Sequence, residues 1–336
     1  MRKIVFLPGK HVTERVFLPE HLEALENSGI ELIVNQGTAN PTSEEAAEWI
    51  AGADVVFTSW GCPLLEKAIL DRAPNLKLVL HAAGSVKPVV TPELWARGIR
   101  VSSAASVLSR GVGETALGLT IVSLKNIWEI TQKARTENWW GYRSDGTRSR
   151  IREMYGSTVG CIGAGHAGRH YMELLRPYGV RLLLNDPTLT REQADAWGAE
   201  LVDLDTLCAR ADVVTVLAPE LPETYRMIDA GRLERMKEGA TLINLARGSL
   251  VDEEALIAEL KRGRIRACLD VTVPEPPPAD HPFRTLPNVV LTGHIAGAVN
   301  NGLHALGRFA MEEYFRFREE GCLAGEVLPS SLNTKA

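Results

Sequence analysis

The chain has 336 residues, and at roughly 150 residues per domain this length predicts two domains, each able to bury its own core. Its 45% hydrophobic and 24% charged residues are typical of a globular protein and exclude a disordered or fibrous chain. The 37 Lys and Arg against 42 Asp and Glu give a net charge of −5, which disfavours nucleic acid or an anionic membrane as a partner. A small, mobile ligand is the better first expectation.

Two features favour a cytoplasmic protein. No apolar run approaches the roughly 18 residues of a membrane helix, and the apolar stretch within Met1–Leu7 is too short for a secretory signal. The five cysteines are scattered and form no CxxC pair, which is typical of reduced thiols in a reducing compartment. We therefore expect a cytoplasmic location and no membrane partner.

Short apolar runs alternate with amphipathic stretches through the first hundred residues, which predicts parallel strands joined by helices. Before the third strand, Thr42 and Glu45 have the spacing of a capping box at the start of a helix. One long helix is then predicted over Gly111–Ala134, and its length suggests a domain or subunit contact. The predicted strands of this part are Ile4–Leu7, Ile30–Val34, Val55–Thr58, Leu76–Leu80 and Ile99–Val101.

The alternation of strands and helices restarts after the long helix, and a last long helix is predicted over Ile295–Glu320. Both halves of the chain therefore predict an α/β protein with two parallel sheets, each covered by helices on both faces. The strands predicted for the second half are Thr158–Ile162, Val180–Asn185, Asp212–Leu217, Thr241–Leu245, Ile265–Asp270 and Val289–Leu291.

A glycine-rich run follows the strand Thr158–Ile162 directly and opens a helix. In this context the first glycine permits a tight turn, the second lets the backbone approach a pyrophosphate, and the third lets the helix pack on the strand. Asp186 ends the next strand, 18 residues after Gly168, which is close to the spacing of an acid that binds an adenosine ribose. Its carboxylate would repel a 2′-phosphate, so the sequence predicts NAD(H) over NADP(H). The run reads Gly163-Ala164-Gly165-His166-Ala167-Gly168.

The same helix also carries a pair of histidines with a metal-ligand spacing. His166 and His170 are four residues apart, which places both on one face of a helix. However, no Glu follows His166 in HExxH fashion, and His166 lies within the pyrophosphate turn. We therefore expect no metal.

Three further residues with useful chemistry follow strands of the second half, at the edge where parallel sheets bind ligands. The planar fork of Arg247 can hold a carboxylate through two hydrogen bonds, although alone it could equally be a structural ion-pair residue. Glu275 and His294 lie on neighbouring loops and are within reach of forming a base and its orienting partner.

These motifs together resemble the NAD-dependent D-isomer-specific 2-hydroxyacid dehydrogenases. The runs NLARGSLVDEEAL, Asn244–Leu256, and LTGHIAG, Leu291–Gly297, are close to signatures of that family, and the resemblance extends from about residue 76 to 297. It implies hydride transfer between NAD(H) and C2 of a D-2-hydroxy or 2-oxo acid. It also implies that Arg247 binds the substrate carboxylate, His294 is the acid/base and Glu275 orients it.

The resemblance implies the architecture as well. A flavodoxin-like substrate-binding domain would comprise residues 1–106 and 299–336, and a Rossmann NAD-binding domain, residues 107–298, would be inserted in it. The active site would lie in the cleft between them, and the protein would be a homodimer. The implied cofactor contacts are Gly163, Gly165, His166, Ala167, Gly168, Asp186, Pro219, Thr224, Leu245, Ala246, Arg247, Asp270, His294 and Gly297, and the implied substrate contacts are Ala83, Gly84, Ser85 and Arg247.

The chain departs from the family pattern at three points. Gly293 stands where a proline usually precedes the catalytic histidine, which could loosen His294. A histidine common after the strand Asp212–Leu217 is absent, so contacts at Pro219 and Thr224 carry over less securely. Lys87 stands where the substrate-carboxylate loop usually has Asp. It could favour a substrate with a second anionic group, pair with an acid such as Glu93, or point into solvent.

Two rival functions remain open from the sequence. The first is a regulatory, corepressor-like protein that binds NAD without turning over a substrate, and the retention of Arg247, Glu275 and His294 argues against it. The second is a methyltransferase with another glycine-rich nucleotide loop, which conflicts with the spacing to Asp186.

Overall fold

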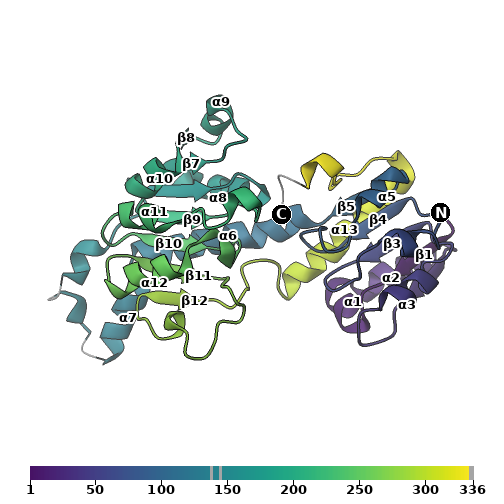
Figure 1. The fold of residues 1–336 in the computed structure, drawn as a ribbon, viewed down its shortest axis with the longest axis horizontal. Coiled ribbons are helices and arrows are strands. Elements are labelled where there is room, and N and C mark those ends of the chain that lie inside the picture. Colours follow the sequence, from purple (N-terminus) through teal and green to yellow (C-terminus); the bar gives the residue numbers. More distant parts are fainter. Residues whose placement is uncertain (137–138, 144–145, 333–336) are drawn as a thin grey trace. The chain divides into compact units, whose positions relative to one another are not determined.

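The computed structural model describes residues 1–136, 139–143 and 146–332 and divides into two compact units. Unit 1 comprises Met1–Ser109 and Gly297–Ala336, and unit 2 comprises Arg110–Ala296. Each unit contains one parallel sheet with helices packed on it (Figure 1). The predicted α/β class with two doubly wound sheets is confirmed.

The sheet of unit 1 has five strands in the order β2-β1-β3-β4-β5, all parallel. This is the flavodoxin-like order, in which ligands bind beyond the carboxyl ends of the strands. Alternate residues of a strand face opposite layers, so Ile4 and Phe6 join one apolar cluster while Val5 and Leu7 join another. The strands are β1 (Lys3–Phe6), β2 (Glu31–Val34), β3 (Val55–Thr58), β4 (Leu78–His81) and β5 (Arg100–Ser103).

The helices of unit 1 form a layer on each face of this sheet. The last long helix packs beside the first two helices of the chain, and α3 packs beside α4. The capping box is present, because the Glu45 N–H donates to Thr42 Oγ1 at 3.3 Å and the Thr42 N–H donates to Glu45 Oε2 at 2.8 Å. The helices are α1 (Lys10–Val16), α2 (Pro19–Glu26), α3 (Ser43–Trp49), α4 (Lys67–Leu70), α5 (Pro92–Ala96), α13 (Asn301–Glu320) and the 3-10 turn η7 (Pro329–Ser331).

The sheet of unit 2 has seven parallel strands in the order β12-β11-β10-β9-β6-β7-β8. The order reverses between β6 and β9, as in a Rossmann fold, and the glycine-rich run follows β6 at this switch point. β8, a three-residue edge strand with the sequence AEL, was not predicted from the sequence. The strands are β6 (Thr158–Ile162), β7 (Arg181–Asn185), β8 (Ala199–Leu201), β9 (Val213–Val216), β10 (Thr241–Asn244), β11 (Arg266–Leu269) and β12 (Val289–Leu291).

Helices also cover this second sheet. Neighbours α10, α11 and α12 share one layer, while α6 lies against α8 where the Thr120 and Tyr171 hydroxyls are 2.6 Å apart. The helices are α6 (Ala105–Leu124), which crosses the border of the units, α7 (Ile127–Thr136), α8 (His166–Leu175), α9 (Arg191–Asp195), α10 (Leu204–Arg210), α11 (Ala230–Arg235) and α12 (Glu253–Lys261). Short 3-10 turns are η1 (Gly141–Arg143), η2 (Thr147–Arg150), η3 (Arg176–Tyr178), η4 (Pro222–Thr224), η5 (Gly248–Leu250) and η6 (Pro282–Arg284).

Three predictions about helices were wrong. The single helix over Gly111–Ala134 is two helices, because Asn126 adopts a left-handed φ of 52° between α6 and α7. The last helix begins at Asn301 instead of Ile295. By length and composition, α6 could cross a membrane, since its mean hydropathy is 1.2; the sequence was expected to contain no such run. However, 39% of this stretch is buried in the protein, and core helices of other proteins meet the same criterion.

Candidate active site

The glycine-rich turn after β6 has room for a ligand only on one side. A Cβ at Gly163, whose φ is 95°, would lie 2.8 Å from the backbone of Ala218, and a Cβ at Gly168 would lie 2.0 Å from the Gly163 carbonyl oxygen. At Gly165, by contrast, a Cβ would meet no described atom within 4 Å. The first and third glycines are therefore required by packing, and the second presents bare backbone to open space.

Helix α8 begins at this turn, and no side chain of the described residues caps it. The N–H groups of a first helical turn lack intrahelical partners and carry a partial positive charge, which suits a pyrophosphate. Asp186, at the end of neighbouring β7, accepts hydrogen bonds from the Ala164 N–H at 2.7 Å and from the Thr188 N–H at 2.9 Å. A carboxylate beside a bare helix N-terminus fits an adenine dinucleotide with a free ribose 2′-hydroxyl.

We predict that Asp186 sets the choice between cofactors. Its charge should make kcat/KM with NADH at least about tenfold higher than with NADPH, because a 2′-phosphate would be repelled. The Asp186→Asn variant keeps an acceptor for Ala164 but removes the charge, and it should narrow that ratio. Initial rates with both cofactors measure this. Equal kcat/KM for the two cofactors in the unmodified protein would contradict this role of Asp186.

Arg247 follows β10 in a loop fixed by a buried amide. Asn244 Nδ2 donates to the Arg247 carbonyl at 2.8 Å, and Asn244 Oδ1 accepts from the Ala246 N–H at 3.1 Å. A Cβ at Gly248 would lie 2.4 Å from the carbonyl carbon of Thr272, so this loop packs on the segment after β11. The Arg247 side chain is exposed, and within the described ranges it has no carboxylate partner. It is therefore available for an external anion.

His294 and Glu275 form a pair at the same edge of the sheet. His294 Nδ1 is in hydrogen-bond contact with Glu275 Oε1, and both side chains are partly exposed, 51% and 39%. A carboxylate that holds Nδ1 fixes the ring and leaves Nε2 for proton exchange with a substrate. The structure thus brings together two residues that lie 19 positions apart in the sequence.

Buried Asp270 holds the turn that carries His294. Its carboxylate accepts from the Thr292 hydroxyl at 2.5 Å and from the N–H groups of Ile295 and Ala296 at 2.8 and 3.0 Å, and its carbonyl accepts from the His294 N–H at 2.8 Å. These bonds occupy residues that the sequence assigned to the last helix. Asp270 was predicted as a cofactor contact, and nothing in the sequence indicated this structural role.

Gly293 is required by the same turn. Its φ is 69° and that of His294 is 62°, so two consecutive residues lie in the left-handed region. Proline, with φ fixed near −65°, could not replace Gly293 in this backbone. The glycine was expected to loosen His294, but four hydrogen bonds to Asp270 hold this turn.

The structure says less about the remaining predicted cofactor contacts. Thr224 Oγ1 donates to the Pro219 carbonyl at 2.7 Å and accepts from the Leu221 N–H at 2.9 Å, so this hydroxyl closes its own loop. Leu245, directly after β10, is buried. Gly297 falls in unit 1, whereas the other predicted cofactor contacts belong to unit 2.

The predicted substrate contacts Ala83, Gly84 and Ser85 also belong to unit 1, in the loop after β4. In the described part of the chain, no acceptor contacts the N–H groups of four consecutive residues, 83–86. The Gly84 carbonyl, by contrast, accepts from Ser103 Oγ at 2.6 Å. A run of free N–H groups of this kind can bind an anion such as a carboxylate.

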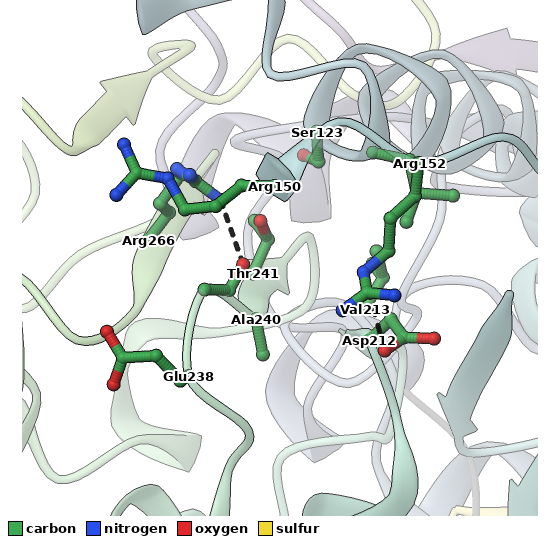
Figure 2. A pocket seen from close by; sticks show the side chains of 11 residues that line it. Ser123, Arg150, Arg152, Asp212, Val213, Glu238, Ala240, Thr241 and Arg266 are labelled. Atoms are coloured by element: carbon green, nitrogen blue, oxygen red, sulfur yellow. Dashed lines mark hydrogen bonds and ion pairs between the residues drawn. The ribbon is translucent and has the colours of Figure 1, made fainter. Parts of the chain in front are cut away.

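A small pocket lies at the opposite edge of the unit 2 sheet, at the amino ends of β9, β10 and β11. Figure 2 shows Arg150, Arg152 and Arg266 around it. Arg150 and Arg266 contact Glu129 at 2.6 and 3.4 Å, and Arg152 lies 3.9 Å from Asp212. Burial lowers the pKa of Arg266. Each guanidinium already has a carboxylate partner, so the pocket is a structural ion-pair network.

Comparison with known proteins identifies the family. A family model described as the NAD binding domain of D-isomer specific 2-hydroxyacid dehydrogenases matches residues 117–296, more than half of the chain. The chain belongs to this family. The match lies within unit 2 and includes the glycine turn, Arg247, Glu275 and His294. Membership of the D-2-hydroxyacid dehydrogenases decides against the methyltransferase interpretation.

Individual proteins similar to this chain match most of its length. A D-3-phosphoglycerate dehydrogenase of Methanocaldococcus jannaschii is 33% identical over 87% of this chain but only 54% of its own length, so the chain spans about half of that relative. A glyoxylate reductase of Thermofilum pendens is 34% identical over 87% of this chain and 85% of its own. A solved structure from Thermus thermophilus is 30% identical, covers 98% of this chain and 100% of its own, and has a TM-score of 0.75.

Proposed function

We propose that the protein is an NAD-dependent D-2-hydroxyacid dehydrogenase that interconverts a D-2-hydroxy acid and its 2-oxo acid. The observation that carries the proposal is the pairing of His294 with Glu275 on a turn held by Asp270, in the unit that carries the dinucleotide turn. NAD, when bound, supplies the hydride acceptor or donor at C4 of its nicotinamide ring.

The side chains supply the rest of the reaction. In reduction, His294 Nε2 donates a proton to the oxygen of the forming hydroxyl, while Glu275 keeps the ring oriented through Nδ1. Arg247 binds the carboxylate of the 2-oxo acid and stabilises the negative charge that develops on its carbonyl oxygen.

A substrate screen tests the proposal. NADH oxidation should be followed with glyoxylate, hydroxypyruvate, pyruvate, phenylpyruvate and 3-phosphohydroxypyruvate. We expect turnover with at least one of them, in keeping with the glyoxylate reductase and phosphoglycerate dehydrogenase relatives. A protein that binds NADH with micromolar affinity and turns over none of them would support the alternative, an NAD-binding regulatory protein.

Lys87 should select a substrate with a second anionic group. Its side chain is exposed and forms no ion pair with a described residue, and the structure pairs Glu93 with Arg97 at 2.8 Å instead. The Lys87→Ala variant should raise KM for 3-phosphohydroxypyruvate several-fold more than KM for glyoxylate, and salt should weaken the preference. Lys77→Ala is the matched control, because Lys77 is exposed at the opposite end of β4. Equal changes in KM for both substrates would show that Lys87 plays no part in selection.

We further propose a homodimer that uses α7. No described side chain of this helix is buried, and Ile127, Trp128 and nearby Trp139 are 41%, 38% and 72% exposed. Apolar side chains gathered on one segment are typical of an interface. Light scattering should give twice the 36.8 kDa mass of the chain, and Trp128→Glu should lower it toward one chain. A monomeric unmodified protein would contradict this proposal.

A further inference from the structure

The two edges of the unit 1 sheet differ in how the chain covers them. At β5, the C-terminal segment adds an antiparallel contact, in which the Ser103 N–H donates to the Gly325 carbonyl at 2.9 Å and the Val327 N–H donates to the Val101 carbonyl at 2.8 Å. At the other edge, β2 pairs with β1 and with no other strand of the described residues. The edge of β2 is therefore open to a further strand.

Backbone groups of β2 point toward this open edge. The Asn35 N–H donates to the Phe6 carbonyl of β1 at 3.1 Å. Because alternate residues of a strand direct their backbone groups to opposite sides, Leu32 and Val34 direct their N–H groups away from β1. No strand among the described residues lies there to accept them. Unpaired groups of this kind are a template for pairing with another chain.

A groove with a volume of about 550 Å³ adjoins the open edge. It is formed by the end of β2, the loop 35–41 and α3. Buried Asn35 fixes this loop, because its Oδ1 accepts from the Gly37 N–H at 2.8 Å and its Nδ2 donates to the Leu7 and Ala39 carbonyls at 3.0 and 3.2 Å. The groove is therefore a formed feature of unit 1.

One wall of the groove combines an aromatic ring with a carboxylate. Trp49 and Glu45 are one turn apart on α3 and both line the groove. Glu45 Oε2 accepts from the Thr42 N–H, whereas its Oε1 has no partner among the described residues. An indole beside a carboxylate suits a Lys or Arg side chain, through a cation–π contact and a charge-assisted hydrogen bond. Among the described residues that line the groove, none is Lys, Arg or His.

The charge of the chain is unevenly distributed, and this edge lies in its most acidic part. Residues 22–66 contain eight Asp and Glu and no Lys, Arg or His, whereas the rest of the chain has 37 Lys and Arg against 34 Asp and Glu. This segment includes α2 and α3, which pack on opposite faces of β2. Lys3 lies 3.7 Å from one of the eight, Glu31. A positively charged partner is therefore favoured, and two copies of this edge would repel each other.

We propose that the edge of β2 and its groove are a docking surface for a basic, extended segment of a partner protein. The segment adds to the sheet beside β2 through main-chain hydrogen bonds, and one of its Lys or Arg side chains lies in the groove beside Trp49 and Glu45. The surface belongs to unit 1 alone. The proposed dehydrogenase reaction uses none of these residues, so the docking surface and the reaction can be tested independently.

Three seven-residue peptides with blocked ends are the probes. KVVKVVK is basic and can extend as a strand. KPPKPPK has the same charge and length, but its consecutive prolines lack the N–H groups of a strand ladder. EVVEVVE can extend as a strand but has the opposite charge. Isothermal titration calorimetry with the full chain measures the Kd of each peptide.

Two variants and a matched control test the position of binding. Val34→Pro removes an N–H that faces the open edge and keeps the bonds to β1, because an edge strand accepts proline at such a position. Glu48→Lys reverses an exposed charge of α3. Glu254→Lys is the control, since it makes the same change at an exposed residue of α12 in unit 2. Tm and the mass from light scattering are recorded for every protein.

We expect KVVKVVK to bind at least about tenfold more tightly than KPPKPPK, the factor of one typical hydrogen bond, and EVVEVVE not to bind. Val34→Pro and Glu48→Lys should each weaken the binding of KVVKVVK several-fold, whereas Glu254→Lys should leave it unchanged. Added salt should also weaken it, because part of the affinity comes from exposed charges.

Equal affinity for the two basic peptides would overturn the proposal, since charge alone would then explain binding. The absence of binding by KVVKVVK, or equal binding of EVVEVVE, would also overturn it. If Val34→Pro or Glu48→Lys lowers the mass from light scattering, a second copy of the chain occupies this edge and the proposal is wrong. Should Val34→Pro fail to fold, Glu48→Lys and the comparison of peptides decide the outcome.

Discussion

Replacement of His294 by alanine should lower kcat by about 10² to 10⁴-fold and leave the affinity for NADH unchanged. The reason is that His294, held by Glu275 through Nδ1, is the group available to donate a proton to the substrate oxygen. Its backbone N–H, which Asp270 binds, is still present in alanine. The measurement is a steady-state kcat with the best 2-oxo acid, together with an NADH titration by fluorescence.

His281 provides a matched control for this variant. It belongs to unit 2 and forms a second His–Glu pair, with Nε2 3.1 Å from Glu253 Oε1. His281→Ala should retain most of the activity, since this pair packs beside Phe283 and has no place in the reaction. If His294→Ala kept most of its kcat, the acid/base assignment would have to be abandoned.

Arg247→Ala should lower kcat/KM by about 10² to 10³-fold, the loss typical of one charged or hydrogen-bonding group that stabilises a developing oxyanion. Arg247→Lys should recover only part of it, because an ammonium keeps the charge but not the planar fork. The exposed side chain has no carboxylate partner in the described residues, so its removal should leave Tm nearly unchanged. Substrate titrations and thermal unfolding measure the two effects.

Arg235→Ala is the control for this variant, since Arg235 is an exposed arginine at the end of α11 in the same unit. It should alter neither kcat/KM nor KM. An Arg247→Ala protein with normal kcat/KM would contradict its assignment, and one that lost activity only through a large fall in Tm would show that Arg247 is structural.

The strands could be predicted because their signal is local. Buried parallel strands are short apolar runs, so Val55–Thr58, Thr158–Ile162 and Val289–Leu291 have the predicted bounds. β8 has no such run, because it is only three residues long and its middle residue, Glu200, is polar and exposed. The break between α6 and α7 depends on the left-handed φ of Asn126, which hydrophobic periodicity does not reveal.

The candidate site likewise has features that could be predicted from the sequence and features that could not. The roles of Gly163 and Gly168 follow from their spacing after a strand, and the structure shows the close contacts that exclude a side chain there. The role of Asp270 depends on partners from another segment, and a single aspartate carries no such signal in a sequence. The positive φ of Gly293 could likewise be recognised only in the structure, because a glycine in a sequence indicates backbone freedom and does not specify a φ value.

The most direct test of the account is isotope transfer from the cofactor. NADH carrying deuterium at both C4 positions should be incubated with the protein and the 2-oxo acid, other than glyoxylate, that it reduces fastest. Glyoxylate is left out because its product, glycolate, has no D and L forms. The product should be analysed by chiral separation and mass spectrometry. The account predicts a D-2-hydroxy acid with one deuterium at C2. A protein that binds NADH yet yields no deuterated hydroxy acid, or yields the L-isomer, would contradict it.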